Sequence, residues 1–90
     1  MTGKALHIQT TDAEIPSGII GIFPNASPTY SILYTKCLGL IFLRGGQTSH
    51  GAIVAREFGI PALIDPNASV IPNAIPVSMN GEMGTWEIQV

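Results

Sequence analysis

The chain has few charged residues and no long apolar run. Lys and Arg together number four, against six Asp and Glu, which gives a formal net charge of −2 over 90 residues. Four scattered cations form neither a phosphate-binding stripe for nucleic acid nor a polybasic segment for anionic lipid. No stretch approaches the roughly 18 apolar residues that span a bilayer. The sequence therefore predicts no nucleic-acid partner and no membrane partner.

Cysteine is also scarce, since Cys37 is the only one and an internal disulfide is therefore excluded. No activating group lies near it in the sequence, so we interpret it as a small apolar residue. The carboxylates and the other histidine, His7, do not show the spacing of a metal site. The N-terminus, MTGKALHIQT, lacks the apolar region of a signal peptide. We therefore predict a cytoplasmic protein with no metal ligands of its own.

What the chain does have is apolar residues, 46% of the total, in short segments separated by Gly and Pro. Ninety residues predict one domain, residues 1–90. Before Gly39 we expect a helix capped by Ser27, and before Gly59 a helix capped by Thr48 or Ser49. DPNAS reads as a turn and NGEMG as a hairpin connection. The order of elements predicts an α/β domain. The strands are expected at Lys4–Thr10, Gly18–Phe23, Leu38–Leu43, Ile60–Ile64, Ala74–Met79 and Thr85–Val90, and the helices at Pro28–Cys37 and His50–Phe58.

The stretch that points to chemistry is LRGGQTSHGAIVAREFGIPALI, where a strand turns into a helix. Gly45 and Gly46 allow positive φ and a close approach of the backbone to a ligand. The hydroxyls of Thr48 and Ser49, together with the helix N-terminus, favour an anion such as phosphate. His50 stands at this turn, and a neutral imidazole is a nucleophile that can accept a phosphoryl group. The same hydroxyls also suit a histidine that merely begins a helix, because capping and anion binding use the same groups.

The segment GGQTSHGAIVAREFGIP, Gly45–Pro61, resembles the phosphohistidine domain of the phosphoenolpyruvate-utilising enzymes. That family includes pyruvate phosphate dikinase, phosphoenolpyruvate synthase and enzyme I of the sugar phosphotransferase system. Its pattern is close to GG-x-T-S-H-x-A-I-V-A-R-E-x-G-I-P. VSMNGEMGTWEI is similar to the family's closing hairpin. The resemblance implies the compact swivelling β/β/α fold of the family, with most of the chain inside it.

The resemblance also implies roles for individual residues. His50 would carry the phosphoryl group on Nε2, with Thr48 and Ser49 orienting the imidazole and contacting the phosphate. Gly45 and Gly46 would permit the close approach, and Arg56 would stabilise charge or dock a partner domain. Two positions depart from the pattern. Gly51 stands where the family often has Ala or Thr, which weakens the start of the helix by up to about 1 kcal/mol. Arg44 stands before the glycines and is an additional candidate phosphate contact.

Partners follow from the same resemblance, because ninety residues cannot hold the rest of such an enzyme. The expected partners are a nucleotide-binding domain, a phosphoenolpyruvate- or pyruvate-binding domain, or both, and Mg²⁺ is expected only in them. This chain would bind no cofactor and would be a phosphotransferase domain rather than a complete enzyme. The alternative is a non-catalytic interaction or regulatory module that keeps the fold, with His50 never phosphorylated.

Overall fold

The computed structural model describes residues 1–46 and 49–89. The described part of the chain forms one six-stranded sheet in the order β4-β3-β2-β1-β5-β6. The first four strands run parallel, whereas β5 is antiparallel to β1 and β6 is antiparallel to β5. Because the chain forms four neighbouring parallel strands and then a hairpin, the expected α/β class is confirmed. The strands are β1 (Thr2–His7), β2 (Ile19–Phe23), β3 (Gly39–Phe42), β4 (Ala62–Ile64), β5 (Pro76–Asn80) and β6 (Thr85–Ile88).

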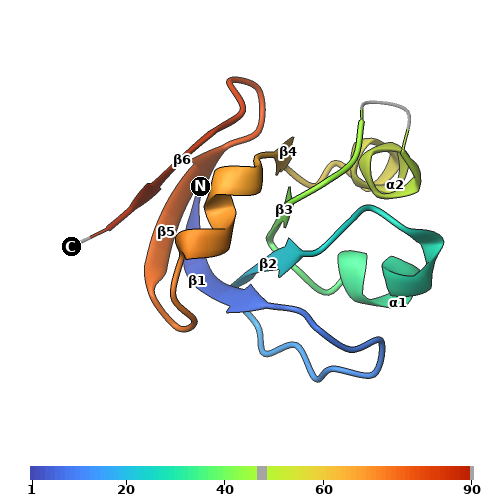
Figure 1. Cartoon of the computed structure of the whole chain (residues 1–90), viewed down its shortest axis with the longest axis horizontal. Coiled ribbons are helices and arrows are strands. Elements are labelled where there is room, and N and C mark those ends of the chain that lie inside the picture. The colour runs from blue at the N-terminus through green and yellow to red at the C-terminus, as the bar shows by residue number, and fades with distance from the viewer. Residues whose placement is uncertain (47–48, 90) are drawn as a thin grey trace.

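The helical segments cover the sheet on both sides, which is why its central strands are apolar throughout. Figure 1 shows α1 (Ser31–Tyr34) and α2 (His50–Phe58) on one side of the sheet and the 3₁₀ segment η2 (Pro66–Val70) on the other. A further 3₁₀ turn, η1 (Pro28–Tyr30), leads directly into α1. All residues of β2 and β3 are buried, as expected for parallel strands with both faces covered.

Successive side chains of β2 and β3 point alternately to two separate cores. The core under α1 and α2, here called the helix-side core, includes Phe23 and Phe42. The core under η2 and the β5–β6 hairpin, the hairpin-side core, includes Ile22 and Ile41. The buried helix-side residues are Ile8, Ile19, Phe23, Ala26, Leu33, Tyr34, Cys37, Leu40, Phe42 and Ala55. The buried hairpin-side residues are Ala5, Ile20, Ile22, Ile41, Leu63, Ala68, Ile71, Val77 and Met79.

The helix that begins at His50 has the predicted bounds, because its end is encoded locally. Gly59 adopts the left-handed conformation, with φ 67° and ψ 27°, and its N–H reaches back to the carbonyls of Ala55 and Arg56. The N–H of Ile60 also donates to the Ala55 carbonyl at 2.8 Å. Glycine is favoured at such a C-cap because it has no Cβ. Pro61 then follows, and the chain enters β4.

The helix expected at Pro28–Cys37 is wrong in length and in type. Ser27 does cap it, accepting a hydrogen bond from the Thr29 N–H, but the first turn is 3₁₀ and the α-helical part ends at Tyr34. The N–H groups of Lys36 and Cys37 bond to carbonyls three residues back, and the Leu38 N–H already bonds to the Ile19 carbonyl in the sheet. Entry into β3 therefore ends the helix early. The segment expected to form a turn at DPNAS is instead part of a 3₁₀ helix, η2.

The C-terminal hairpin is confirmed and curls back over the sheet toward β4. Asn80 Oδ1 accepts hydrogen bonds from the N–H groups of Glu82 and Met83, which closes the turn between β5 and β6. The Trp86 Nε1–H donates to Asp65 Oδ2 at 2.9 Å, and Asp65 follows β4 directly. Since β4 and β6 are the two edges of the sheet, this bond joins its two ends. In the described part of the chain, no helix is long and apolar enough to cross a membrane.

Candidate functional site

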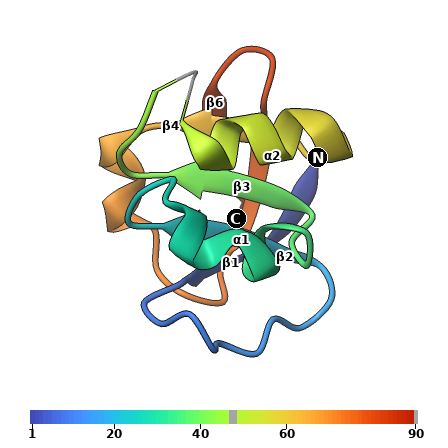
Figure 2. The same cartoon turned by 90° about the vertical axis from the view of Figure 1, so that its right-hand side faces the viewer.

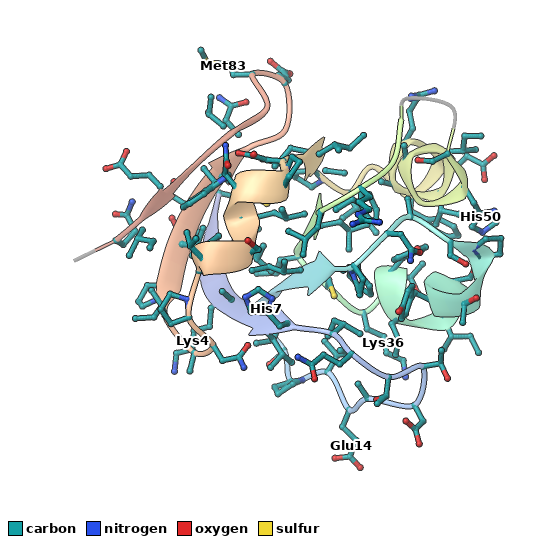
Figure 3. All side chains as sticks on the ribbon, viewed as in Figure 1. Lys4, His7, Glu14, Lys36, His50 and Met83 are labelled. Atoms are coloured by element: carbon teal, nitrogen blue, oxygen red, sulfur yellow. The ribbon has the colours of Figure 1, made fainter. Side chains whose placement is uncertain are left out.

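His50 is the first residue of α2 and lies exposed on the outer end of the helical side, as Figure 3 shows. The loop that leads to it leaves β3 after Phe42 and passes through the two glycines. Gly45 has φ 143°, and a Cβ placed there would lie 3.3 Å from Ala26 Cβ and 3.4 Å from Ser49 Oγ. Glycine is therefore required at position 45 both for its backbone conformation and for space. The close approach of the backbone to a ligand stays a prediction.

Gly46 and Ser49 form a small hydrogen-bonded turn before the helix. The carbonyl of Gly46 accepts from the Ser49 N–H at 3.1 Å and from the Ser49 hydroxyl at 2.6 Å. The φ of Gly46 is not in the left-handed region, so of the two glycines Gly45 uses the positive φ that glycine allows. Ser49 occupies the N-cap position with φ −67° and ψ 156°, but its side chain does not cap the helix. The Ser49 hydroxyl proton is thus already used within the loop. Thr48 lies outside the described residues.

One backbone donor at the start of α2 is also occupied. The Gly51 N–H donates to the Ala26 carbonyl at 2.9 Å, which ties the helix to the loop after β2. A Cβ on residue 51 would lie 2.7 Å from Phe42 Cζ and 2.9 Å from Ala26 Cβ. The departure from the family pattern at Gly51 therefore has a packing reason, because the Phe42 ring and Ala26 fill the space that an alanine methyl needs. The anion site expected at this helix start has one donor fewer than the sequence suggests.

The imidazole of His50 has a partner that the sequence analysis missed. His50 Nε2 lies 2.8 Å from Ser31 Oγ, at the first residue of α1. The Ser31 hydroxyl also lies 2.7 Å from the Pro28 carbonyl, to which it donates. A hydroxyl has one proton, so while Ser31 donates to Pro28 it can only accept from His50. In that arrangement Nε2 carries the imidazole proton and Nδ1 carries the lone pair. The nitrogen expected to take phosphate is therefore covered in this state.

The position of Ser31 is fixed by the helix-side core through η1. The Tyr34 hydroxyl donates to the Ser27 carbonyl at 2.6 Å, immediately before Pro28. The rings of Tyr30 and Tyr34 both pack against Phe23, with centroid distances of 5.5 Å and 4.9 Å. Burial, and then the neighbouring Tyr30 phenol, raise the pKa of Tyr34 to about 12. Tyr34 consequently stays a neutral hydrogen-bond donor throughout the physiological range. The only sequence signal for Ser31 was its place in the first turns after a Ser-Pro cap.

Arg56 lies in the last turn of α2, six residues beyond His50. Six residues correspond to about 9 Å along a helix axis. The side chain is exposed and lines an open groove between α2, β4 and the β5–β6 turn, with Phe42, Met83 and others. A cation at this end of the helix is favourable because it faces the negative end of the helix dipole. The structure thus places Arg56 beside the groove.

Cys37 and His7 are both held by contacts within the fold. Cys37 is buried, and its Sγ lies 3.5 Å from the Leu33 carbonyl. Burial raises the pKa of the thiol to about 11, and a hydrogen bond from the Gly21 backbone lowers it by less. The interpretation of Cys37 as a small apolar residue is confirmed. His7 ends β1 and its Nε2–H donates to the Ile71 carbonyl. Among residues 1–46 and 49–89, no three His, Cys, Asp or Glu side chains gather closely enough to hold a metal ion.

The sequence is similar to sequences of several known proteins. Residues 15–84 match the family model described as "PEP-utilising enzyme, mobile domain". The chain is 37% identical over 73 residues to the probable phosphoenolpyruvate synthase of Staphylothermus marinus, covering 79% of this chain. It is 32% identical over 79 residues to the rifampicin phosphotransferase of Bacillus subtilis, covering 86% of this chain. In both cases it spans only 9% of the relative's length.

A solved structure shows the same fold. The solution structure of an Enzyme I protein (nEIt) superposes with a TM-score of 0.70 and 25% sequence identity. The match covers 83% of this chain and 32% of that chain. The expected compact phosphohistidine-domain fold is thereby confirmed, as is the sequence resemblance on which it rested.

Proposed function

The chain belongs to the family of the mobile domain of PEP-utilising enzymes, and on that premise we propose that it is a phosphoryl carrier in which His50 is transiently phosphorylated. The observation that carries the proposal is the placement of one exposed imidazole at the start of α2, behind a glycine-glycine turn. The donor and the acceptor of the phosphoryl group would be partner domains, as the 9% coverage of the relatives suggests. The chain would swivel between them.

In the proposed reaction, an imidazole nitrogen attacks the phosphorus of the donor. A P–N bond forms, the bond from phosphorus to the donor's leaving group breaks, and the second ring nitrogen keeps its proton. For attack by Nε2, the imidazole must first release Ser31 and carry its proton on Nδ1. The start of α2 then presents its positive dipole end to the incoming charge. Transfer to the acceptor reverses these steps.

The residues of the loop before α2 and Arg56 at its end have different proposed roles. Gly45 and Gly46 shape the loop, and Ser49 would turn its hydroxyl from the Gly46 carbonyl toward the phosphate. Thr48 would act beside it. We propose that Arg56 contacts a partner domain, which its place next to the groove favours over contact with phosphate on His50. Mg²⁺ would be held by the nucleotide-binding or phosphoenolpyruvate-binding partner.

The first experiment uses phosphoramidate, a small donor that phosphorylates imidazole without any protein. The chain and its His50→Ala variant are incubated with it, and the products are tested for acid-labile, base-stable phosphate by mass spectrometry. We expect one phosphoryl group on the natural chain and none on the variant. Because His50 is exposed, the variant should keep its stability within about 0.5 kcal/mol.

The alternative function, a non-catalytic module, predicts a different result. A histidine that serves only to begin α2 would leave the chain without labile phosphate under conditions where free imidazole is labelled. A loss of several kcal/mol of stability in His50→Ala would also favour it. Labelled phosphoenolpyruvate and ATP, each supplied with extract of the source cells, then identify the natural donor.

A further inference from the structure

The turn between β5 and β6 contains the pair Asn80-Gly81, and Figure 2 shows this turn projecting at one end of the molecule. The fold favours both residues. Asn80 Oδ1 accepts hydrogen bonds from the N–H groups of Glu82 and Met83 at 3.0 and 3.1 Å, which closes the turn. A Cβ on Gly81 would lie 3.0 Å from the backbone nitrogen of Ala62, on the edge strand β4. Packing therefore favours an asparagine followed directly by a glycine at this place.

Asparagine is a thermally labile residue, because the next amide nitrogen can attack its side-chain carbonyl carbon. Asn80 is exposed, so water can reach it. No described residue accepts a hydrogen bond from the Gly81 N–H, so the fold does not hold this nitrogen. Because Oδ1 bonds to donors beyond Gly81, the Asn80 side chain lies folded back along the Gly81 peptide. The same two donors lie where negative charge would develop on Oδ1 during the attack.

The other three asparagines provide an internal comparison, since each is exposed and each is followed by alanine. After Asn67 and Asn73, the N–H of the alanine donates to a backbone carbonyl, at 3.1 and 2.8 Å. Asn25 is the closest match to the turn, because its Oδ1 accepts from the Ser27 N–H at 3.0 Å. Ser27 is its single donor among the described residues, and the Ala26 that follows is buried. The β5–β6 turn thus differs from the other three sites by its glycine and its second donor.

We propose that Asn80 is a site of spontaneous deamidation in the folded chain, with the Gly81 amide nitrogen as the nucleophile. This nitrogen gives its proton to hydroxide and bonds to Asn80 Cγ. The bond from Cγ to Nδ2 breaks, and Nδ2 takes a proton from water and leaves as ammonia. Water then opens the resulting cyclic imide, at Cγ to give aspartate or at the main-chain carbonyl carbon to give isoaspartate. The reaction does not depend on the phosphoryl-carrier function.

The two products have different consequences for the turn. Aspartate keeps the backbone and offers a charged oxygen to the same two N–H groups, which strengthens these hydrogen bonds. Isoaspartate adds a methylene group to the backbone. It also converts the Asn80 carbonyl, which accepts from the Gly84 N–H at 2.9 Å, into a free carboxylate. We expect the longer turn to lose its fit against Ala62. Either product adds a negative charge to the groove that Asn80 and Arg56 line.

The test measures deamidation at each asparagine in the natural chain, kept folded in mildly alkaline buffer and sampled by peptide mass spectrometry. We expect Asn80 to react about tenfold faster than Asn25, because of the second donor and the conformational freedom of glycine. Chromatography should separate aspartate and isoaspartate peptides at position 80. In Asn80→Gln the fast reaction should be lost. Asn80→Asp should unfold at the same urea concentration as the natural chain or higher, and the purified isoaspartate form at a lower one.

The variant Ile8→Val shows whether the reaction takes place in the folded turn. Ile8 is buried in the helix-side core, on the other face of the sheet from the hairpin. The variant should raise the unfolded fraction about two- to tenfold. We expect the rate at Asn80 to stay within about twofold, because the turn reacts without global unfolding.

Three results would overturn the inference. Similar rates at Asn80 and Asn25 would show that the turn does not promote the reaction. A rate at Asn80 that rises in Ile8→Val in step with the unfolded fraction would place the reaction in the unfolded chain. Aspartate without isoaspartate would exclude the cyclic imide, because direct hydrolysis of the side chain leaves the backbone unchanged.

Discussion

The two faces of the sheet are packed with different kinds of side chain. The helix-side core contains the rings of Phe23, Tyr34 and Phe42, whose centroids lie 4.9 to 6.1 Å apart at steep or tilted angles. The buried residues of the hairpin-side core have no rings, and among the described residues that pack against them from the half-buried layer, Trp86 alone has one. Aromatic pairs have preferred orientations, whereas aliphatic side chains mainly fill volume. On the face that carries His50, the packing thus fixes the orientations of side chains as well as the distances between them.

That difference extends outward to the site. The Tyr34 hydroxyl reaches the Ser27 carbonyl, Pro28 follows, and the Pro28 carbonyl holds the hydroxyl of Ser31 against His50. On the hairpin side, Trp86 is linked to Asp65 and His7 to the Ile71 carbonyl, and neither of these bonds leads to His50. A ring in the helix-side core can therefore influence the imidazole, while a side chain in the hairpin-side core contributes stability alone.

The largest expected effect comes from removing a ring. Phe23→Ala should lower the free energy of unfolding by about 3–5 kcal/mol, because Phe23 is fully buried and contacts both tyrosines. Ile41→Ala, in the hairpin-side core, should cost about 2–5 kcal/mol. Urea unfolding measures both, with Phe23→Leu as a milder variant if Phe23→Ala fails to fold. Only the Phe23 variants should shift the His50 ring signals in an NMR spectrum. Equal shifts in Ile41→Ala would show that the two cores are not separate.

The second effect concerns Gly51, where two physical terms oppose each other. Alanine has a higher helix propensity than glycine by about 1 kcal/mol. The added methyl, however, would overlap Phe42 Cζ and Ala26 Cβ, and such overpacking costs about 1–3 kcal/mol. We expect Gly51→Ala to be destabilising in thermal unfolding. In a Phe42→Leu background, Gly51→Ala should therefore cost less stability than it does in the natural chain. A gain in stability from Gly51→Ala by itself would mean that the Phe42 ring moves aside freely.

The sequence predicts elements best where their limits are set locally. α2 has the expected bounds because Gly59 and Pro61 end it, and the hairpin follows from Asn80 and Gly84 at its turn. The strands were each found, shifted by up to three residues at their ends. α1 could not be predicted correctly, since the sheet bond from Leu38 to Ile19 ends it and that contact spans 19 residues of chain.

The candidate site shows the same limit. His50 and the need for Gly45 follow from a contiguous motif, and their positions match the expectation. Ser31 lies 19 residues away from His50 in the sequence, and the two meet only because α1 packs beside α2. The use of the Gly51 N–H by Ala26 is equally a product of tertiary packing. Local patterns therefore identify the candidate residue, but not the groups that contact it in the folded chain.

A third and smaller effect is a dependence of stability on pH that comes from the helix-side core. The folded protein raises the pKa of Tyr34 from 10.0 to about 12 and that of Cys37 from 9.0 to about 11. Both groups are neutral when protonated and belong to the helix-side core, so folding favours the protonated forms. Their stabilising contribution is complete below about pH 9 and is lost as the pH rises through 9 to 12. Thermal unfolding between pH 7 and 11 should show this decline. In Cys37→Ala the decline should begin about one pH unit higher, and an unchanged onset would contradict the assignment to Cys37.

The smallest effect on stability, and the sharpest test of the helical side, is Ser31→Ala. Ser31 is half-buried and its hydroxyl makes two hydrogen bonds near the surface, so the variant should lose about 1 kcal/mol or less. Its effect on the tautomer and the reactivity of His50 should be more distinct than its effect on stability, because Nε2 loses the hydroxyl that covers it. Nitrogen NMR shifts of the ring should then show less of the Nε2–H form. Phosphorylation by phosphoramidate should become about two- to tenfold faster, which is the factor that a hydrogen bond of this strength represents.

The control for Ser31→Ala is Thr35→Ala, which removes an exposed hydroxyl from the end of the same short helix without contact to His50. Ser31→Thr keeps the hydroxyl and should restore the slow rate. If Ser31→Ala instead slows phosphorylation and Ser31→Thr restores it, the hydroxyl orients the imidazole for attack rather than covering it. The aromatic packing of the helix-side core would then serve to hold a reactive geometry, and the hairpin side would differ from it only in lacking a reactive group to hold.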